Sequence, residues 1–354
     1  MKLTPGFDFE LLTDLTETPG VPGYEDDVRA LVEDALSPEV DEIRTDAMGN
    51  VVGTVHGVEN PDYEVTVAAH MDEIGFMVSH VSEEGFVSVD PLGGFDPRVL
   101  KAQRVRIHAE DGSLPGVIGS PPPHTLDDED LEKKPKTEDV RIDLGLDGEA
   151  VSDLVSPGDL VTMEQGTEIV GETVTGKALD DRASVLATIE AARRIGDPDV
   201  TVHFAATVQE EVGLRGARAL GVDIDSDLAI ALDVTVANDV PGFEAGKYVT
   251  ELGEGAAIKL KDSSVITNPK VNRRLREVAE REGIAHQFEI LPAGGTDTAG
   301  FQTPGGATPV GAISIPTRYL HTVTEMAHLA DIEATIDLLS AFLGSETGDH
   351  EYRL

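Results

Sequence analysis

The spacing of apolar residues changes character twice along the 354-residue chain, and this change limits the folds open to it. Two amphipathic helical patterns near the start lead into apolar, strand-like runs at residues 51–55 and 65–69. Between about Glu73 and Met163, short β-branched runs alternate with glycine, proline and aspartate turns, a pattern typical of a small barrel or sandwich. After Val174, long helical patterns again alternate with apolar strands.

We therefore expect an α/β fold whose mixed, mostly parallel sheet carries helices on both faces and receives an inserted small all-β domain. The predicted domains are a discontinuous α/β domain, residues 1–72 plus 164–354, and a β-barrel-like insert, residues 73–163. Within the insert, the proline-rich and charged segment 121–136 is expected to be a loop.

The chain is strongly acidic, with 67 Asp and Glu against 27 Lys and Arg and a net charge of −40. Such a surface repels phosphate backbones and anionic lipids, so neither nucleic acid nor a membrane is an expected partner. The acids are dispersed, and 17 of the basic residues are Arg against 10 Lys. This pattern favours a halophilic protein, in a cytoplasm whose concentrated salt screens the self-repulsion. The alternative is an ordinary acidic protein.

The chain has no cysteine. Disulfides, thiolate metal ligands and a cysteine nucleophile are therefore excluded. The first ten residues lack the basic and then apolar order of a secretory signal, and no uncharged apolar stretch approaches ~18 residues. We therefore expect a cytoplasmic location.

Polar side chains that can hold metal ions follow several of the predicted strands. Ligands of open α/β sheets bind outside the carboxyl ends of the strands, so these positions are expected to converge. The residues at strand ends are His70, Asp72, Glu210, Glu211, Asp233 and His321, and Asp180 lies just before the helical pattern 183–194. Two imidazoles and several carboxylates without a thiolate predict a site for Zn²⁺ or Co²⁺, with Mn²⁺ possible.

The adjacent acids Glu210 and Glu211 are expected to divide the work. Neighbouring side chains of an extended chain point to opposite sides, so the two are not expected to chelate one ion together. One carboxylate would bind metal while the other takes a proton from water. Asp72 lies two residues after His70 and therefore on the same side, where it can orient the imidazole.

Five segments of the chain form long and specific motifs. They are Ala-His-Met-Asp-Glu-Ile-Gly-Phe at 69–76, Gly-Phe-Asp-Pro-Arg-Val-Leu at 94–100, Lys-Ala-Leu-Asp-Asp-Arg at 177–182, Val-Gln-Glu-Glu-Val-Gly-Leu-Arg-Gly at 208–216 and Thr-Arg-Tyr-Leu-His at 317–321. These segments resemble the dinuclear metallo-aminopeptidases that assemble as tetrahedral (TET) particles, and the similarity spans nearly the whole chain.

The resemblance implies a role for each candidate residue. His70 and Asp233 would hold one divalent ion, Glu211 and His321 the other, and Asp180 would bridge the two. Glu210 would act as general base and then as the acid that protonates the leaving amine, with Asp72 steering His70.

The resemblance also implies features beyond these side chains. The Asp180–Asp181 peptide bond is expected to be cis. The β insert would build subunit contacts in a homo-oligomer, a tetrahedral dodecamer that encloses a chamber, and the substrates would be short peptides.

Three functions remain under consideration. The leading one is an exopeptidase that removes amino-terminal residues from short peptides inside a self-compartmented particle. The second is a related dinuclear amidohydrolase that acts on acylated amino acids or blocked peptides. The third is a non-catalytic acidic assembly or binding protein of the same fold.

The small-residue loop 294–300 is a further candidate, because backbone can approach a substrate closely there. The alternative is a plain structural turn. The loop has no basic residue, so the sequence favours neutral, apolar amino-terminal residues as substrates.

Overall fold

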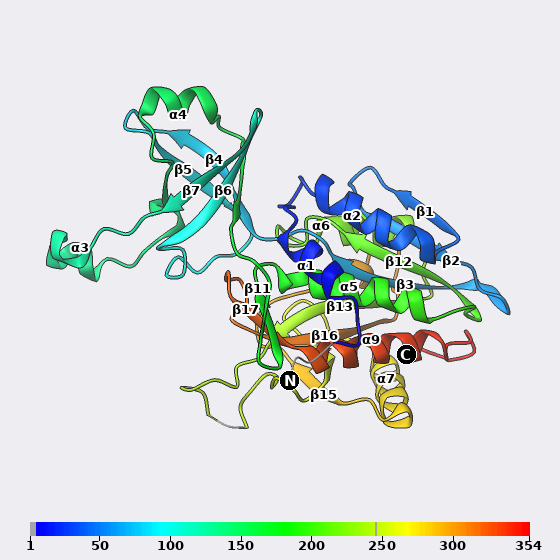
Figure 1. The fold of residues 1–354 in the computed structure, drawn as a ribbon. Coiled ribbons are helices and arrows are strands. Elements are labelled where there is room, and N and C mark those ends of the chain that lie inside the picture. The colour runs from blue at the N-terminus through cyan, green and yellow to red at the C-terminus, as the bar shows by residue number, and fades with distance from the viewer. Residues whose placement is uncertain (1–4, 245) are drawn as a thin grey trace.

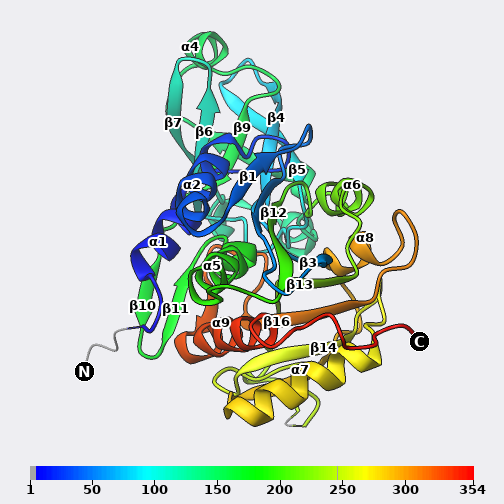
Figure 2. The same ribbon diagram turned by 90° about the vertical axis from the view of Figure 1, so that its right-hand side faces the viewer.

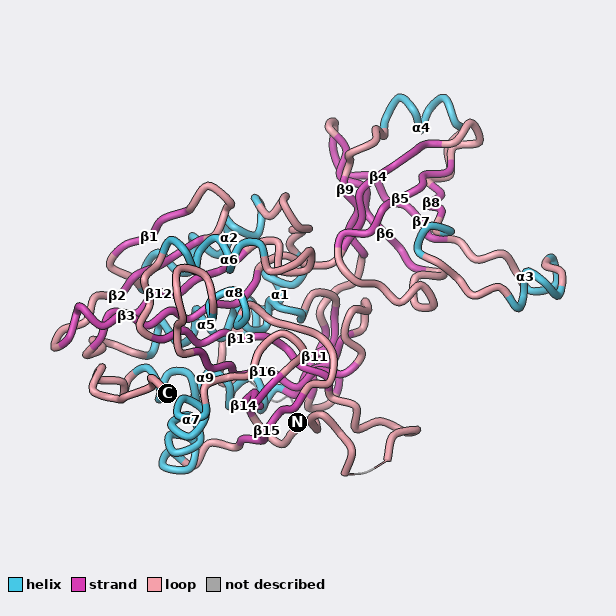
Figure 3. The backbone as a smooth tube through the Cα atoms, turned by 180° about the vertical axis from the view of Figure 1, so that it is seen from behind, coloured by secondary structure: helices cyan, strands magenta, loops and turns pink. Residues whose placement is uncertain are grey.

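The computed structural model describes residues 5–244 and 246–354. The chain forms an α/β body and a separate barrel that projects from it (Figure 1). Seen from behind, the helix α3 lies at the tip of an arm that extends from the barrel (Figure 3).

Within the described residues, the sheet of the body has eleven strands. The central path runs β1 (Glu42–Thr45), β2 (Val51–Val55), β12 (Val200–Thr207), β3 (Asn60–His70), β13 (Leu228–Val236), β16 (Val310–Arg318), β17 (Glu325–His328), β11 (Thr173–Gly176) and β10 (Glu168–Val170). Off this path, β14 (Ala256–Lys261) pairs with β16 and with β15 (His286–Ile290).

The expectation of a mixed sheet is confirmed, but the expectation that it is mostly parallel is wrong. Only β12–β3, β3–β13, β13–β16 and β14–β15 are parallel among the described pairings. Among the antiparallel pairs, short connections join β1 to β2 and β10 to β11. A short connection cannot make the crossover that a parallel pair needs.

Helices cover both faces of the sheet because apolar side chains alternate along its central strands. Val67, Phe204 and Ile230 belong to the core under one face, and Ala68 and Ala205 to the core under the other. The first face carries α1 (Phe9–Glu17), α2 (Asp26–Leu36), α5 (Leu179–Arg194), α7 (Pro269–Glu282) and α9 (Leu329–Leu343); the second carries α6 (Arg215–Asp223) and α8 (Thr298–Gln302). Figure 2 shows α5 and α9 on one side of β12, β3 and β13, and α6 and α8 on the other.

The insert is a closed barrel of the strands β4 (Gly75–Val81), β5 (Phe86–Leu92), β8 (Arg141–Asp143), β7 (Gly112–Ile118), β6 (Gln103–Ala109) and β9 (Leu160–Met163). Its core is apolar and includes Phe76, Ile107 and Ile142.

The insert is not all β, because helices α3 (Asp128–Glu132) and α4 (Gly148–Leu154) interrupt it. The Asp147 carboxylate caps α4 by accepting from the Ala150 N–H, and Val151 is buried in the barrel core. The segment 121–136, expected to be a loop, contains α3 and the 3₁₀ turn Pro123–Thr125. Two further 3₁₀ turns span Ser37–Glu39 and Thr137–Asp139.

A buried ion pair marks the place where the chain leaves the body for the barrel. Lys177 Nζ donates to both oxygens of Glu73, at 2.8 and 2.7 Å. The Gly20 N–H also donates to Glu73, at 3.3 Å. These contacts join the exit from β3, the segment after β11 and the turn between α1 and α2. Among the described residues, no helix has the length and apolar content needed to cross a bilayer.

Candidate metal centre

All seven sequence-predicted residues converge at one edge of the body. The parallel register places the carboxyl ends of β3, β12, β13 and β16 side by side, with His70 opposite Thr207 and Asp233 opposite Ser314. Asp180 enters from the start of α5, where it and Asp181 depart from helical backbone angles. The peptide bond between these two aspartates is cis, as the resemblance implied.

The Asp180 carboxylate lies between the two imidazoles. Its Oδ1 is 3.2 Å from His70 Nε2 and its Oδ2 is 3.3 Å from His321 Nε2. Asp233 Oδ1 lies 4.0 Å from His70 Nε2, and Glu211 Oε2 lies 3.8 Å from His321 Nε2. Two groups of donors thus share one carboxylate.

The donor separations suit divalent cations. Ligands at 2.0–2.2 Å from a tetrahedral ion lie about 3.4 Å from one another, close to the separations between Asp180 and the imidazoles. In the described part of the chain, Asp181 Oδ1 and Asp297 Oδ1 are buried without a hydrogen-bond partner. Buried carboxyl oxygens without donors are costly, and a nearby cation would offset that cost. The residues present therefore fit a metal centre.

Glu210 and Glu211 point to different donor groups, but not for the expected reason. Both follow the end of β12, and Gln209 before them has a left-handed backbone with φ 55°. Strand alternation therefore does not separate them, and both carboxylates reach the site. Glu210 Oε2 lies 3.9 Å from His70 Nε2, whereas Glu211 lies on the His321 side.

Burial and mutual repulsion shift the proton affinities of these groups. Burial raises the pKa of Glu211 to about 8, with the Asp180 charge adding to the rise. Burial likewise holds the pKa values of Glu210 and Asp233 well above their ordinary range. Burial is the largest single influence on His321 and would lower its pKa, but the hydrogen bond to Asp180 and the charges of Asp180, Glu211 and Glu325 together outweigh it and raise that pKa to about 10. Without bound cations, the side chains around this cluster supply too little positive charge to balance its carboxylates.

Asp72 has a wider set of contacts than the sequence predicted. Its carboxylate accepts the backbone N–H groups of Glu210 and Glu211 at 3.0 and 3.1 Å. Its Oδ1 lies 3.6 Å from His70 Nδ1, whereas its backbone carbonyl lies 3.1 Å from the same nitrogen. Asp72 therefore orients the backbone of both glutamates as well as the imidazole.

Sequence reasoning missed three buried carboxylates around the site. Glu325 accepts the N–H groups of Asp180 and His321, Asp181 accepts the His70 N–H, and Asp297 accepts the Thr207 hydroxyl. Asp181 had a signal, since it stands beside Asp180 in the segment 177–182, but Glu325 and Asp297 were only single acids in a chain this acidic.

A pocket of about 700 Å³ opens over these donors. Beyond the metal-binding candidates, its wall is mainly apolar and includes Val234, Val236, Leu291 and Leu320. The loop 294–300 contributes Gly294, Gly295 and Thr296, which confirms that it borders the site. The insert supplies Gly94, Phe95 and Asp96 to the same pocket.

Comparison with known proteins identifies close relatives. The family model of the M42 glutamyl aminopeptidases matches residues 49–338. A lysyl aminopeptidase of Pyrococcus furiosus is 37% identical over 351 residues, covering 95% of this chain and 96% of the relative.

Solved structures of peptidases are also similar to this chain over nearly its whole length. An aminopeptidase from the archaeon Desulfurococcus kamchatkensis superposes with a TM-score of 0.91 at 36% identity, covering 95% of this chain and 94% of that one. The TET1 peptidase of Pyrococcus horikoshii, which can assemble into a tetrahedron or a large octahedral shell, gives 0.84 at 32% identity, covering 95% and 98%. The chain therefore belongs to the M42 glutamyl aminopeptidase family and is a peptide-bond hydrolase of the aminopeptidase type.

Proposed function

We propose that this aminopeptidase removes amino-terminal residues from short peptides with two divalent cations per subunit. The observation that carries the proposal is the Asp180 carboxylate, which lies 3.2 and 3.3 Å from the two imidazoles. We assign His70 and Asp233 to one ion, Glu211 and His321 to the other, and Asp180 to both. The nitrogen and oxygen donors suit Zn²⁺ or Co²⁺, with Mn²⁺ possible.

Bound cations would lower the pKa of a water molecule to about 7 and polarise the scissile carbonyl. Glu210 then accepts the proton of the attacking water and returns it to the departing amine. Its carboxylate is nearly buried at the donor cluster, and its backbone N–H is held by Asp72.

The pocket wall supports a neutral, apolar amino-terminal residue as the preferred substrate. Val234, Val236, Leu291 and Leu320 present apolar surface, and the loop beside them contributes glycine backbone. The relative from Pyrococcus furiosus is named for lysine, so preference differs within the family. A panel of amino-acid amides tests this part, and a preference for lysyl or glutamyl amides would contradict it.

The assembly is proposed to be a homo-oligomer, a tetrahedral dodecamer, with residues 73–163 as the domain that forms subunit contacts. The support is the likeness to TET1, which assembles as a tetrahedron or an octahedral shell. In this proposal the catalytic domain comprises residues 1–72 plus 164–354. Sedimentation analysis of the purified chain tests the subunit number, and deletion of the arm 121–136 tests the role of the insert.

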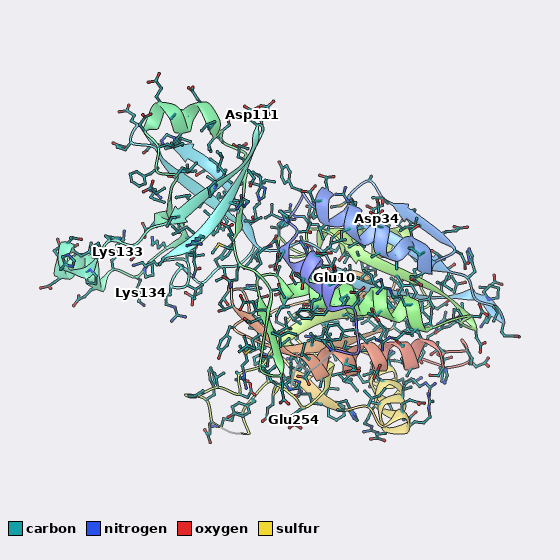
Figure 4. All side chains as sticks on the ribbon, in the orientation of Figure 1. Glu10, Asp34, Asp111, Lys133, Lys134 and Glu254 are labelled. Carbon is teal, nitrogen blue, oxygen red and sulfur yellow. The ribbon has the colours of Figure 1, made fainter. Side chains whose placement is uncertain are left out.

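The acidic surface supports a halophilic and cytoplasmic protein. Glu10, Asp34, Asp111 and Glu254 are exposed on four different parts of the molecule (Figure 4). Because a net charge of −40 repels itself, activity and assembly are expected to be lost on dilution into low salt. Full function in dilute buffer would contradict the halophilic part, and cell fractionation tests the location.

Two measurements on one preparation test the central proposal. Elemental analysis after dialysis against zinc or cobalt should give two ions per chain. Free peptides should be cleaved and their N-acetylated forms should not. Cleavage of the acetylated forms alone would favour the amidohydrolase alternative, and absence of both metal and hydrolysis would leave a binding protein.

A further inference from the structure

Glu325 is the first residue of β17 and is buried, with 2% of its surface exposed. Its two carboxylate oxygens accept one backbone N–H each. Oε2 accepts from Asp180 at 3.0 Å and Oε1 accepts from His321 at 2.9 Å. One side chain therefore joins two backbone segments that both carry proposed metal ligands.

The segment that carries His321 depends on this contact for its shape. Tyr319 and His321 both have left-handed backbone, with φ 60° and 58°. Such angles are uncommon for residues with a side chain and need support from their surroundings. The Glu325 carboxylate, four residues further on, supplies that support directly to the His321 N–H.

The other proposed ligands are held by different groups. Asp181 accepts the His70 N–H at 3.2 Å, and Asp72 accepts those of Glu210 and Glu211. Asp233 lies within β13 and is held by the sheet itself. Loss of Glu325 would therefore disturb His321 and the bridging Asp180 while leaving the supports of His70 and Asp233 in place.

We propose that Glu325 is a positioning residue that sets the affinity of the cation position shared by His321 and Glu211, through the backbone N–H groups of Asp180 and His321. This inference rests on the proposed two-cation function. Glu325 acts through the backbone, because each of its two oxygens accepts a backbone N–H group. The His70 and Asp233 position is expected to depend on it less.

The test is a calorimetric titration of metal-stripped protein with Co²⁺, for the unchanged chain and for Glu325→Gln. Glutamine has the same shape but replaces one acceptor oxygen with an NH₂ group that faces a backbone N–H. The unchanged chain should bind two ions. The variant should bind one ion within threefold of normal affinity and the other at least tenfold more weakly.

A matched control is Asp331→Asn, which creates the same defect away from the metal centre. The buried Asp331 carboxylate also accepts two backbone N–H groups, from Gly253 and Gly255, each at 2.8 Å. This variant should keep both affinities, and thermal melting of both variants reports any general loss of stability. If Glu325→Gln does not fold, Glu325→Asp keeps the charge but shortens the reach, and should weaken the same position by a smaller factor.

The outcomes separate this inference from the proposed function. Two normal affinities in Glu325→Gln, or equal weakening of both positions, would overturn the positioning role. A loss of Co²⁺ affinity in Asp331→Asn as large as the loss in Glu325→Gln would also overturn it, because the effect would then be general. No binding by the unchanged chain would instead overturn the two-cation function itself.

Discussion

The metal-centre edge of the body and the barrel insert use charge in opposite ways. At the edge, His70, Asp72, Asp180, Asp181 and Asp233 are all buried. Among the described residues 75–163, Thr162 has the only buried polar side chain. The barrel instead carries ion pairs at its surface, such as Arg106–Glu164, and its arm exposes Lys133 and Lys134 (Figure 4). Buried charge is therefore concentrated at the candidate metal centre, whereas the charge of the barrel is exposed.

The largest contrast should appear between two glutamates. Glu210→Gln removes the proposed base, so kcat is expected to fall by about 10² to 10⁴, the usual contribution of general-base catalysis. Glu164→Gln, which breaks the exposed pair with Arg106 of the insert, should leave kcat within about twofold, because exposed pairs contribute little. Steady-state kinetics on a dipeptide measure both. Equal losses would remove the distinction between the two regions.

The next contrast concerns stability. Glu73→Gln leaves the Lys177 ammonium buried without its ion-pair partner, because the two side chains are only 3% and 7% exposed. Breaking a buried pair in this way is expected to lower the free energy of unfolding by about 3–5 kcal/mol. Glu164→Gln should cost no more than about 1 kcal/mol. Urea denaturation of the two variants gives both numbers, and a small loss for Glu73→Gln would show that water reaches the pair.

The pH dependence of stability should also differ between the regions. Burial raises the pKa of Glu25 in the body from 4.5 to about 7, whereas Arg98 lowers the pKa of Asp96 in the insert to about 2. A raised carboxyl pKa means that the folded state holds the proton longer, so stability is lost as pH rises from 4.5 to 7. The loss attributable to Glu25 is at most about 3 kcal/mol.

Glu25→Gln should therefore stabilise the protein at pH 8 and leave it unchanged at pH 4, since both states are then protonated. Asp96→Asn acts with the opposite sign: it removes a stabilising charge that is present above pH 3.8 and lost as pH falls toward 2. Urea denaturation at pH 8 and pH 4 measures the effect of Glu25→Gln, and a further series at pH 2 measures the loss of the Asp96 contribution. Stabilisation by Glu25→Gln at pH 4 would contradict the assignment.

The smallest effect is expected where the two regions meet. Phe95 of the insert stacks on Phe76 with ring centroids 4.3 Å apart and also lines the site pocket. Phe95→Ala removes part of the apolar pocket wall and should raise KM about fourfold, which corresponds to the ~0.8 kcal/mol of one buried CH₂ group, with kcat nearly unchanged. Leu114→Ala, in the same barrel but away from the pocket, is the control. A change in kcat alone would mean that the insert acts on the chemistry.

The sequence predicted much of this architecture. Apolar periodicity located the strands of the body, the barrel-like character of the insert and the expected convergence of His70, Asp72, Glu210, Glu211, Asp233 and His321 at strand ends. It did not predict the antiparallel flanks of the sheet or helices α3 and α4. Strand direction depends on how connections run in space, and short amphipathic stretches have too few residues for a clear period.

Residue types and their order along the chain determined the donor set, the absence of thiol chemistry and the acidic surface. Only the tertiary structure decided which carboxylate holds which backbone N–H. Glu325 lies 145 residues from Asp180, and Asp72 lies 138 residues from Glu210. Such contacts have no periodic signature, because any buried acid can accept from any amide that folding brings within hydrogen-bond distance.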